Sequence, residues 1–451
     1  MSIQLLKHVS RKLPEGGEVL VLNTGAVITP EAEAMVQALH SRDIRGIRSH
    51  LEKLAEKGAQ KFMESYYVGY GHKSIGDCGT ASVFIEGVSM LTAKAIQDSM
   101  LYSGQESSTR YIDFATQRFA DPLRTDTSGD ILEAWRALYV TAQEPLKEHL
   151  REQFPKAAEE KESVYEKAIA APAFDITRGF LPSGATTNLA WHANLRQFAD
   201  RLALLRHHPL DEVRAVTDSL SDAMAEAFPS SFGHKRYEET ETYNREWKGG
   251  RYYFQESVYP DFALAWNGID TRLLQKHGDT LLKRPPKTEL PKFIAECGTL
   301  RFDFLLDFGS FRDIQRQRSV VQRMPLVTME HGFEPWYLNE LPDDLRGDVE
   351  DLVGKQKKRI GALGAPPEIA QYYIPMGYRL PNRISGDIPA LVYIAELRAQ
   401  STVHPTLQVR ARQMAEALEE AFGPYGLRLH IDRNPGRFDT KRGTHDIVEK
   451  P

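Results

Sequence analysis

Four arginine side chains are concentrated in a short stretch of the second half of the chain, at Arg312, Arg316, Arg318 and Arg323. Arginine carries a planar fork of hydrogen-bond donors that matches the oxygens of phosphate and carboxylate groups. The concentration therefore predicts an anion-binding site. The alternative is a solvated helix face paired with nearby acids, because most charged surface residues do no chemistry.

The residues before these arginines predict how they are positioned. Large apolar residues occupy alternate positions from Leu300 to Phe308, which is typical of a strand with one buried face. Gly309 and Ser310 end the alternation, and Ser310 with Asp313 has the spacing of a capping box. We therefore expect a strand that turns into an arginine-rich helix.

The same order of strand, Gly, Ser and helix occurs in the first half, at residues 80–111. Further matches follow in the same order in both halves: Leu181-Pro182-x-Gly184 with Ile374-Pro375-x-Gly377, Leu205-Arg206 with Leu397-Arg398, and His208-Pro209 with His404-Pro405. Ordered matches of this kind predict that the chain contains two diverged copies of one fold.

We expect an α+β protein of two tandem domains, each with an antiparallel or mixed sheet and helices, in a pseudo-two-fold arrangement. The first domain is placed at residues 1–230 and the second at residues 231–451, with a bridging segment at 231–290 and a tail at 430–451. A helix is predicted from Asn188 to Arg206, ahead of the His-Pro motif.

Composition limits the class of protein. The chain of 451 residues has a net charge of -5, which gives no general case for nucleic-acid or membrane binding. Its two cysteines cannot form a disulfide framework. No apolar run is long enough to cross a membrane, and no signal peptide is predicted, so we expect a cytoplasmic protein. Neither a phosphate-binding loop nor a cluster typical of metal ligands is present.

One part of the first half resembles a known family. Gly71-His72, the following strand, and Ser103-x-x-Glu106-x-Ser108-x-Arg110-Tyr111 are similar to the signature of flavin-dependent thymidylate synthases. The Arg-His-Arg triplet of that signature is replaced by Asp98-Ser99-Met100 in the first copy. In the second copy Arg316-Gln317-Arg318 stands at the triplet, whereas Leu326-Val327-Thr328 replaces Ser-x-Arg.

The resemblance implies roles for individual residues, in three groups. Arg206 and Arg398 are expected to orient the pyrimidine and are the catalytic candidates. The nucleotide-binding candidates are Glu106, Ser108, Arg110 and Arg178. The cofactor-binding candidates are His72, Ser74, Asn194, Arg196, Arg316 and Arg318, and no metal is expected.

The family builds its sites between subunits, so the resemblance implies one composite site in a tandem chain. Ser108 and Arg110 would come from the first copy, and Arg316 and Arg318 from the second. The counterpart made from Asp98 and Thr328 would bind neither ligand. Four copies of the fold, as in the family tetramer, imply a homodimer.

The implied activity is reductive methylation at C5 of a uracil nucleotide, with FAD as cofactor and a reduced folate and NADPH as co-substrates. Two alternatives remain open. The chain is either a catalytically inactive descendant that binds flavin or nucleotide in a structural or regulatory role, or a repurposed fold with unrelated chemistry. A flavin spectrum distinguishes the enzyme from a colourless binder.

Overall fold

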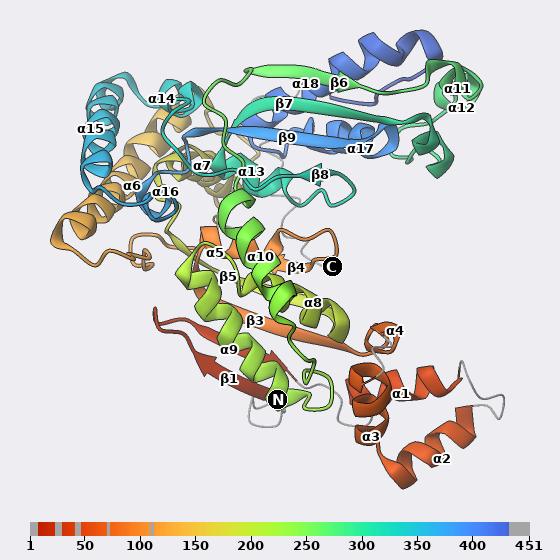
Figure 1. Cartoon of the computed structure of the whole chain (residues 1–451). Coiled ribbons are helices and arrows are strands. Elements are labelled where there is room, and N and C mark those ends of the chain that lie inside the picture. Colours follow the sequence, from red (N-terminus) through yellow and green to blue (C-terminus); the bar gives the residue numbers. More distant parts are fainter. Residues whose placement is uncertain are drawn as a thin grey trace. The chain divides into compact units, whose positions relative to one another are not determined.

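The computed structural model describes residues 8–22, 29–40, 47–69, 73–107, 109 and 112–432 (Figure 1). The chain divides into two compact units. Unit 1 comprises Met1–Ser108 and Thr186–Tyr252, and unit 2 comprises Thr109–Ala185 and Tyr253–Pro451. The predicted domain boundary at residue 230 separates the two sequence repeats. It is a different division from these two units, and it stays a prediction.

Unit 1 is built on a five-stranded antiparallel sheet with the strand order β1-β2-β3-β5-β4. The strands are β1 (His8–Lys12), β2 (Glu18–Leu22), β3 (Thr80–Ser89), β4 (Ser103–Glu106) and β5 (Thr186–Asn194). The helices are α1 (Pro30–His40), α2 (Ile47–Lys57), α3 (Gln60–Phe62), η2 (Met63–Gly69), α4 (Lys73–Gly76), α5 (Met90–Gln97), α8 (Leu195–Leu205), α9 (Asp211–Ala227) and α10 (Glu238–Arg251).

The core of unit 1 follows from the alternation of apolar residues along its strands. Val21, Val83 and Trp191 are paired across β2, β3 and β5, and all three are buried. Because side chains two positions apart share a face, this row and its neighbours form one apolar surface. Helix α9 packs against β1 and β2 (Figure 1).

The helix predicted from Asn188 to Arg206 is wrong over its first part. Residues Thr186–Asn194 form strand β5, and α8 begins only at Leu195. Along β5 the apolar Leu189, Trp191 and Ala193 are buried, with less buried positions between them. Asn194 is the residue that ends the strand, because its side chain accepts a hydrogen bond from the backbone of Gln197 and caps the new helix.

Unit 2 contains a four-stranded antiparallel sheet with the order β6-β7-β9-β8. Its strands are β6 (Phe262–Asn267), β7 (Thr299–Asp307), β8 (Val321–Gln322) and β9 (Arg379–Asp387). Its helices are α6 (Asp126–Gln153), α7 (Glu162–Thr177), η4 (Arg178–Phe180), α11 (Thr271–Gln275), α12 (Gly278–Leu282), η5 (Lys292–Cys297), α13 (Phe308–Ile314), α14 (Pro335–Asn339), α15 (Asp343–Ala362), α16 (Pro367–Ala370), η6 (Gln371–Tyr373), α17 (Ile388–Arg398), α18 (Pro405–Phe422) and η7 (Gly423–Tyr425).

The predicted strand before the arginines is confirmed as β7, but the predicted capping box is wrong. The N-cap of α13 is Asp307, whose Oδ1 accepts a 2.9 Å hydrogen bond from the backbone nitrogen of Ser310. The Ser310 hydroxyl instead contacts His404 and Thr406. Because α13 ends at Ile314, only Arg312 lies on the helix, and Arg316, Arg318 and Arg323 follow it.

Four strands of the unit 1 sheet, in the order β2-β3-β5-β4, correspond to the unit 2 order β6-β7-β9-β8. In each, a strand that leads into a capped helix (β3 or β7) pairs with a strand that leads into a second capped helix (β5 or β9), and a short strand lies on the outer side (β4 or β8). The shared strand order and caps agree with the duplication predicted from the sequence. The fold is α+β with antiparallel sheets.

A local two-fold relationship is visible inside unit 2, where the two Pro-containing motifs meet. Pro182 and Pro375 form an antiparallel bridge. Ser183 N donates to Ile374 O, and Met376 N donates to Leu181 O, each at 2.9 Å. The two bonds are equivalent under exchange of the repeats, since each joins the third residue of one motif to the first residue of the other.

The helices of the two repeats also meet in unit 2. Helix α6 packs against α15 (Figure 1), and the Gln356 side chain of α15 donates a 3.0 Å hydrogen bond to the backbone oxygen of Ile131. Helix α18 packs against β6 and β7 (Figure 1). No helix in the described part of the chain is long and apolar enough to cross a membrane.

Candidate functional site

Four arginines of unit 2 surround the carboxylate of Asp313. They come from three segments: Arg178 from η4, Arg312 and Arg316 from α13 and its exit, and Arg398 from the end of α17. Burial raises the pKa of Asp313, but the fields of these arginines outweigh burial and hold the pKa below its ordinary value. We call these four side chains and Asp313 the arginine cluster.

Arg178 is a buried member of the arginine cluster. Its side chain lies over the first turn of α13, where a Cβ added to Gly309 would be 3.4 Å from Arg178 Nε. Burial lowers the pKa of the guanidinium, yet Tyr337 and the carboxylates of Asp175 and Asp313 raise it overall, so the group stays charged. Its Nε and Nη2 atoms are buried and have no hydrogen-bond partner among the described residues.

Arg398 and Arg316 contact Asp313 in different ways. Arg398 Nη2 donates a 2.7 Å hydrogen bond to the backbone oxygen of Asp313, whereas Arg398 Nε has no hydrogen-bond partner in the described residues. Arg316 Nη2 lies 3.6 Å from Asp313 Oδ1, and its side chain is 51% exposed. Burial lowers the pKa of Arg398, which marks it as a cation in surroundings of low polarity.

The charge balance of the arginine cluster favours binding through specific donors rather than through a strong field. The four guanidiniums interact with three carboxylates, those of Asp313, Asp175 and Asp307. These seven groups therefore carry an excess of one positive charge. Asp307 is already satisfied, because it accepts hydrogen bonds from Ser310 N, Tyr337 Oη and Thr406 Oγ1. Buried guanidinium N–H groups of Arg178 and Arg398 remain, and an oxyanion would satisfy them.

The equivalent part of unit 1 lacks this set. Counting from the N-caps Ser89 and Asp307, Ala95 stands where Asp313 does, and Asp98 where Arg316 does. Lys94 of α5 corresponds to Arg312, and its ammonium forms a buried 2.7 Å ion pair with Glu106. The second repeat has Met324 at the position of Glu106, and Gln315 Nε2 lies 3.8 Å from its sulfur.

The Glu106 side chain, a nucleotide-binding candidate, already has partners within unit 1. Its carboxylate is 2% exposed, pairs with Lys94, and accepts a 3.0 Å hydrogen bond from Gln97. The nucleotide-binding role assigned to Glu106 stays a prediction, and its direct contacts are structural. Ser108, Arg110 and His72 lie outside the described residues.

Three further candidates meet at one corner of unit 1. Asp77 Oδ1 accepts hydrogen bonds from Asn194 Nδ2 at 3.1 Å and makes an ion pair with Arg196 Nε at 2.7 Å. Ser74 lies on α4, which packs against α8. We call Ser74, Asp77, Asn194 and Arg196 the α4–α8 corner. Sequence reasoning missed Asp77, although its position three residues after Ser74 on a helical turn was a usable signal.

Arg206 and Arg318 lie elsewhere. Arg206 is the C-cap of α8, and its Nη1 atom is 3.7 Å from Glu241 Oε2 on α10. Burial and then Arg236 lower the pKa of Arg206. Arg318 is exposed in the segment after α13. The structure therefore brings Arg178, Arg316 and Arg398 together, and separately Ser74, Asn194 and Arg196.

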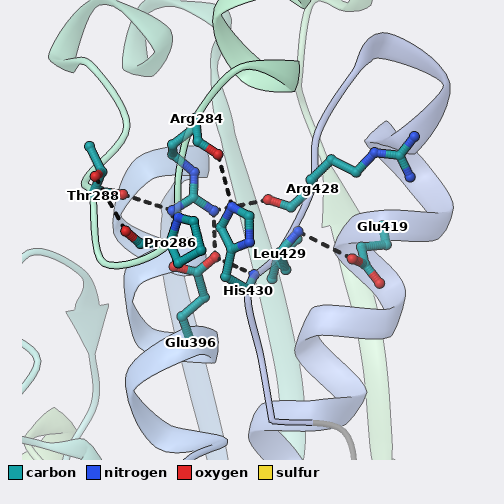
Figure 2. Close-up of polar contacts among 8 residues, drawn as sticks. All are labelled: Arg284, Pro286, Thr288, Glu396, Glu419, Arg428, Leu429 and His430. Carbon is teal, nitrogen blue, oxygen red and sulfur yellow. Dashed lines mark hydrogen bonds and ion pairs between the residues drawn. The ribbon is translucent and has the colours of Figure 1, made fainter.

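A second group of polar side chains in unit 2 is structural by contrast. Figure 2 shows Arg284 beside Glu396, with the backbone of Arg428 and Thr288 accepting its hydrogen bonds at 2.9 and 2.8 Å. His430 donates from its backbone to Glu396 at 2.7 Å and from Nε2 to Arg284 O at 2.9 Å. These bonds hold residues 428–430 on α17 and use most donors and acceptors internally.

Comparison with solved structures gives weak likeness. A UMP/dUMP methylase, PolB, of Streptomyces cacaoi bound with 5-Br dUMP is 15% identical, with a TM-score of 0.31 over 53% of this chain and 94% of that chain. A flavin-dependent thymidylate synthase of Helicobacter pylori, complexed with FAD and dUMP, is 15% identical, with a TM-score of 0.28 over 45% of this chain and 93% of that chain. These scores are too low to carry an argument.

Two relatives match this chain over most of their length. A UPF0159 protein of Chlamydia muridarum is 26% identical over 421 residues, which covers 80% of this chain and 79% of the relative. A UPF0159 protein of Thermoplasma acidophilum, Ta1429, is 24% identical over 451 residues, which covers 82% of this chain and 88% of the relative. Matches of this extent include residues of both sheets.

One family model matches part of the chain. Residues 15–230 match the model described as thymidylate synthase complementing protein. This range includes every described strand of unit 1 except β1, together with the α4–α8 corner. Residues 15–230, slightly less than half of the chain, are therefore similar to the thymidylate synthase complementing protein family.

Proposed function

We propose that the protein is a flavin-dependent enzyme that methylates C5 of a uracil nucleotide with a methylene group from a reduced folate. The observation that carries the proposal is the arginine cluster, which offers buried N–H groups of Arg178 and Arg398 without a hydrogen-bond partner in the described residues. The family match over residues 15–230 includes Arg178 and supports a uracil nucleotide as the ligand.

In this proposal the arginine cluster holds the nucleotide. Arg178 binds the phosphate through its free edge, because a guanidinium fork matches two phosphate oxygens. Arg398 is held by the backbone of Asp313, so its Nε is directed by a fixed helix end. That atom is suited to stabilise negative charge on a pyrimidine oxygen, as preorganised donors do in other enzymes.

FAD is the proposed cofactor. At the α4–α8 corner, Arg196 is 34% exposed on its side chain and Asp77 is 31% exposed, so a donor and an acceptor reach the surface side by side. This pairing fits the alternating N–H and C=O groups of a flavin ring edge. Ser74, Asn194 and Arg196 would hold it there, and the cofactor roles that the resemblance implies for Arg316 and Arg318 stay predictions. Bound flavin would supply the hydride, with NADPH and folate as co-substrates.

The composite site implied by the sequence stays part of this proposal, as do the homodimer and a cytoplasmic location. Its stoichiometry is measurable: one composite site per chain predicts one flavin and one nucleotide bound per chain at saturation. Light scattering at micromolar concentration checks the oligomeric state, and a strictly monomeric mass contradicts the homodimer.

The direct test is chemistry at C5. Uridine or deoxyuridine monophosphate carrying tritium at C5 is incubated with the protein, FAD, NADPH and methylene-tetrahydrofolate, and tritium release is measured. Release that is lost in Arg398→Ala supports the enzyme. If neither nucleotide releases tritium, although the protein binds flavin and nucleotide, the inactive descendant is the correct account.

That second account has its own supporting observation. Asp98 replaces an arginine of the signature, and Glu106 pairs with Lys94, which supports a loss of binding capacity in this set of motif residues. A colourless protein that binds neither flavin nor nucleotide would instead favour unrelated chemistry on this fold.

A further inference from the structure

A π-helix lies immediately before the α4–α8 corner in the chain. Residues Met63–Gly69 form η2, a full seven-residue π-helical segment. Such segments are rare because their hydrogen-bond geometry is unfavourable, and they occur frequently at functional sites. Its buried residues are Met63 and Tyr67, which pack in one apolar cluster with Ile75 of α4. The π-helix therefore fixes the side chains that line one side of α4.

Tyr67 is enclosed, and its hydroxyl makes no hydrogen bond within the described part of the chain. The residue is 1% exposed, and its Oη has no hydrogen-bond partner among the described residues. The phenol packs directly on Gly76, where an added Cβ would lie 2.6 Å from the hydroxyl oxygen. The ring of His234 crosses the ring of Tyr67 edge-on, with centroids 4.9 Å apart. Both contacts fix the direction of the hydroxyl.

The hydroxyl is a donor at neutral pH. Burial raises the pKa of Tyr67 above its ordinary value, Asp200 and Asp77 raise it further, and Arg196 opposes them. The phenol therefore keeps its proton in the field of the same Asp77 that binds Arg196. A protonated phenol that finds no acceptor among the residues described has a hydrogen bond to give.

An unsatisfied buried hydroxyl destabilises a fold, whereas phenylalanine would fill the same space without that cost. Packing on Gly76 and His234 explains the ring of Tyr67 but not its oxygen. We propose that the Tyr67 hydroxyl is a ligand-binding donor of the α4–α8 corner, which donates a hydrogen bond to an oxygen of the bound flavin. This inference rests on the proposed flavin function and adds a residue to it.

Two flavin oxygens are chemically possible acceptors: a ring carbonyl and a phosphate oxygen. Riboflavin carries the ring without phosphate, and ADP carries phosphates without the flavin ring. Dissociation constants of FAD, riboflavin and ADP are measured for the full-length protein and for Tyr67→Phe, by flavin fluorescence and by calorimetry for ADP. Weaker riboflavin binding in the variant identifies the carbonyl, and weaker ADP binding identifies the phosphate.

The variant also separates a binding role from a structural one. Tyr67→Phe is expected to raise the dissociation constant of FAD about 3- to 10-fold, the loss of one hydrogen bond. Its urea midpoint without ligand is expected to equal or exceed that of the wild type, because an unpaired polar group has been removed. The matched control is Tyr165→Phe, whose hydroxyl donates a 2.9 Å hydrogen bond to Phe154 O. That control should lower the midpoint and leave FAD binding unchanged.

The outcomes are distinct. A Tyr67→Phe protein that binds FAD as tightly as the wild type overturns the inference, whether its stability falls or not. If the wild type itself binds none of the three ligands, the proposed flavin function has failed and the inference fails with it.

Discussion

Arg398 Nη2 donates a 2.7 Å hydrogen bond to the backbone oxygen of Asp313, and Arg201 Nη2 donates one of the same length to Ala95 in unit 1. Ala95 and Asp313 occupy equivalent positions after the N-caps of α5 and α13. The contact therefore pairs Arg398 with Arg201, although the Leu-Arg motif pairs it with Arg206. Arg398 lies one helical turn further along its helix than Arg201.

Arg206 and Arg398, which the Leu-Arg motif makes equivalent in sequence, have different surroundings in the structure. Arg206 makes its ion pair with Glu241 of α10, whereas Arg398 belongs to the arginine cluster. Of the two catalytic candidates, Arg398 therefore has the surroundings that the proposed reaction needs.

The first prediction concerns Arg178. In the second repeat Gln371 stands at its position, and the backbone of Val327 donates a 3.0 Å hydrogen bond to the Gln371 side chain. Arg178→Gln should weaken nucleotide binding by about 10- to 100-fold, because one charge-assisted interaction of about 1.5–3 kcal/mol is lost. Calorimetric titration with deoxyuridine monophosphate measures it.

The control for Arg178 is Arg272→Gln, an exposed arginine of α11 outside the arginine cluster. Equal affinities for wild type, Arg178→Gln and Arg272→Gln would mean that the buried donors of Arg178 do not face the nucleotide.

The second prediction concerns Arg316, which is assigned to the flavin. Arg316→Ala should raise the dissociation constant of FAD about 10-fold and change nucleotide affinity less, because the residue is 51% exposed and Arg178 and Arg398 remain. Lys283→Ala is the control, since Lys283 is an exposed cation that pairs with an aspartate at 3.1 Å, Asp279, away from the arginine cluster. If Arg316→Ala weakens nucleotide binding more than FAD binding, Arg316 belongs to the nucleotide site and not to the flavin site.

Much of the fold follows from patterns in the sequence. The alternation of residues 300–308 predicts β7, and the repeated Pro motifs predict the equivalence that is seen directly where Pro182 meets Pro375. Strand β5 was hidden because Asn188–Asn194 continues without a break into α8, and a short apolar run does not distinguish strand from helix.

The residues of the candidate site could be predicted from motif spacing, but their partners could not. Motif spacing identifies Arg178, Arg316 and Arg398, but only the folded chain shows that they converge on Asp313. The contacts that occupy Glu106, and the ion pair of Arg196 with Asp77, depend on residues distant in sequence. No local pattern indicates such long-range partners, since tertiary packing decides them.

The third prediction decides between two roles for Glu106. If its role is the buried pair with Lys94, Glu106→Gln leaves an ammonium with 0% exposed side chain without its counter-charge. We expect a loss of about 3–5 kcal/mol in the free energy of unfolding, measured by urea denaturation. A binding role predicts instead a weaker nucleotide complex and an unchanged urea midpoint.

The second repeat suggests the matched double variant. Because Met324 occupies the position of Glu106, Lys94→Met combined with Glu106→Met should be less destabilised than Glu106→Gln. If the double variant is the less stable of the two, the ion pair contributes net stability that apolar packing does not replace.

The last prediction concerns Lys248 of α10, which is 2% exposed. Its ammonium lies 4.2 Å from the ring centroid of Tyr252 and 4.8 Å from that of Trp247. Burial, and then Arg201, lower the pKa of Lys248 against the opposing effect of Asp98, and the result is about 7 instead of the ordinary 10.5. The folded protein therefore holds the proton less tightly than the unfolded chain does.

The sign of the effect on stability follows from this difference. Below about pH 7 Lys248 is charged in the folded and the unfolded protein, and the folded protein carries the full cost of burying the charge. Between pH 7 and 10.5 the folded lysine loses its proton, and this cost disappears. Lys248→Met should therefore be more stable than wild type at pH 6 by about 2–4 kcal/mol, with the two rings offsetting part of the penalty. The difference should shrink by pH 10. Urea denaturation at both pH values measures it, with the exposed Lys283→Met as control. A Lys248→Met protein that is less stable by the same amount at pH 6 and pH 10 would show that the ring contacts outweigh burial.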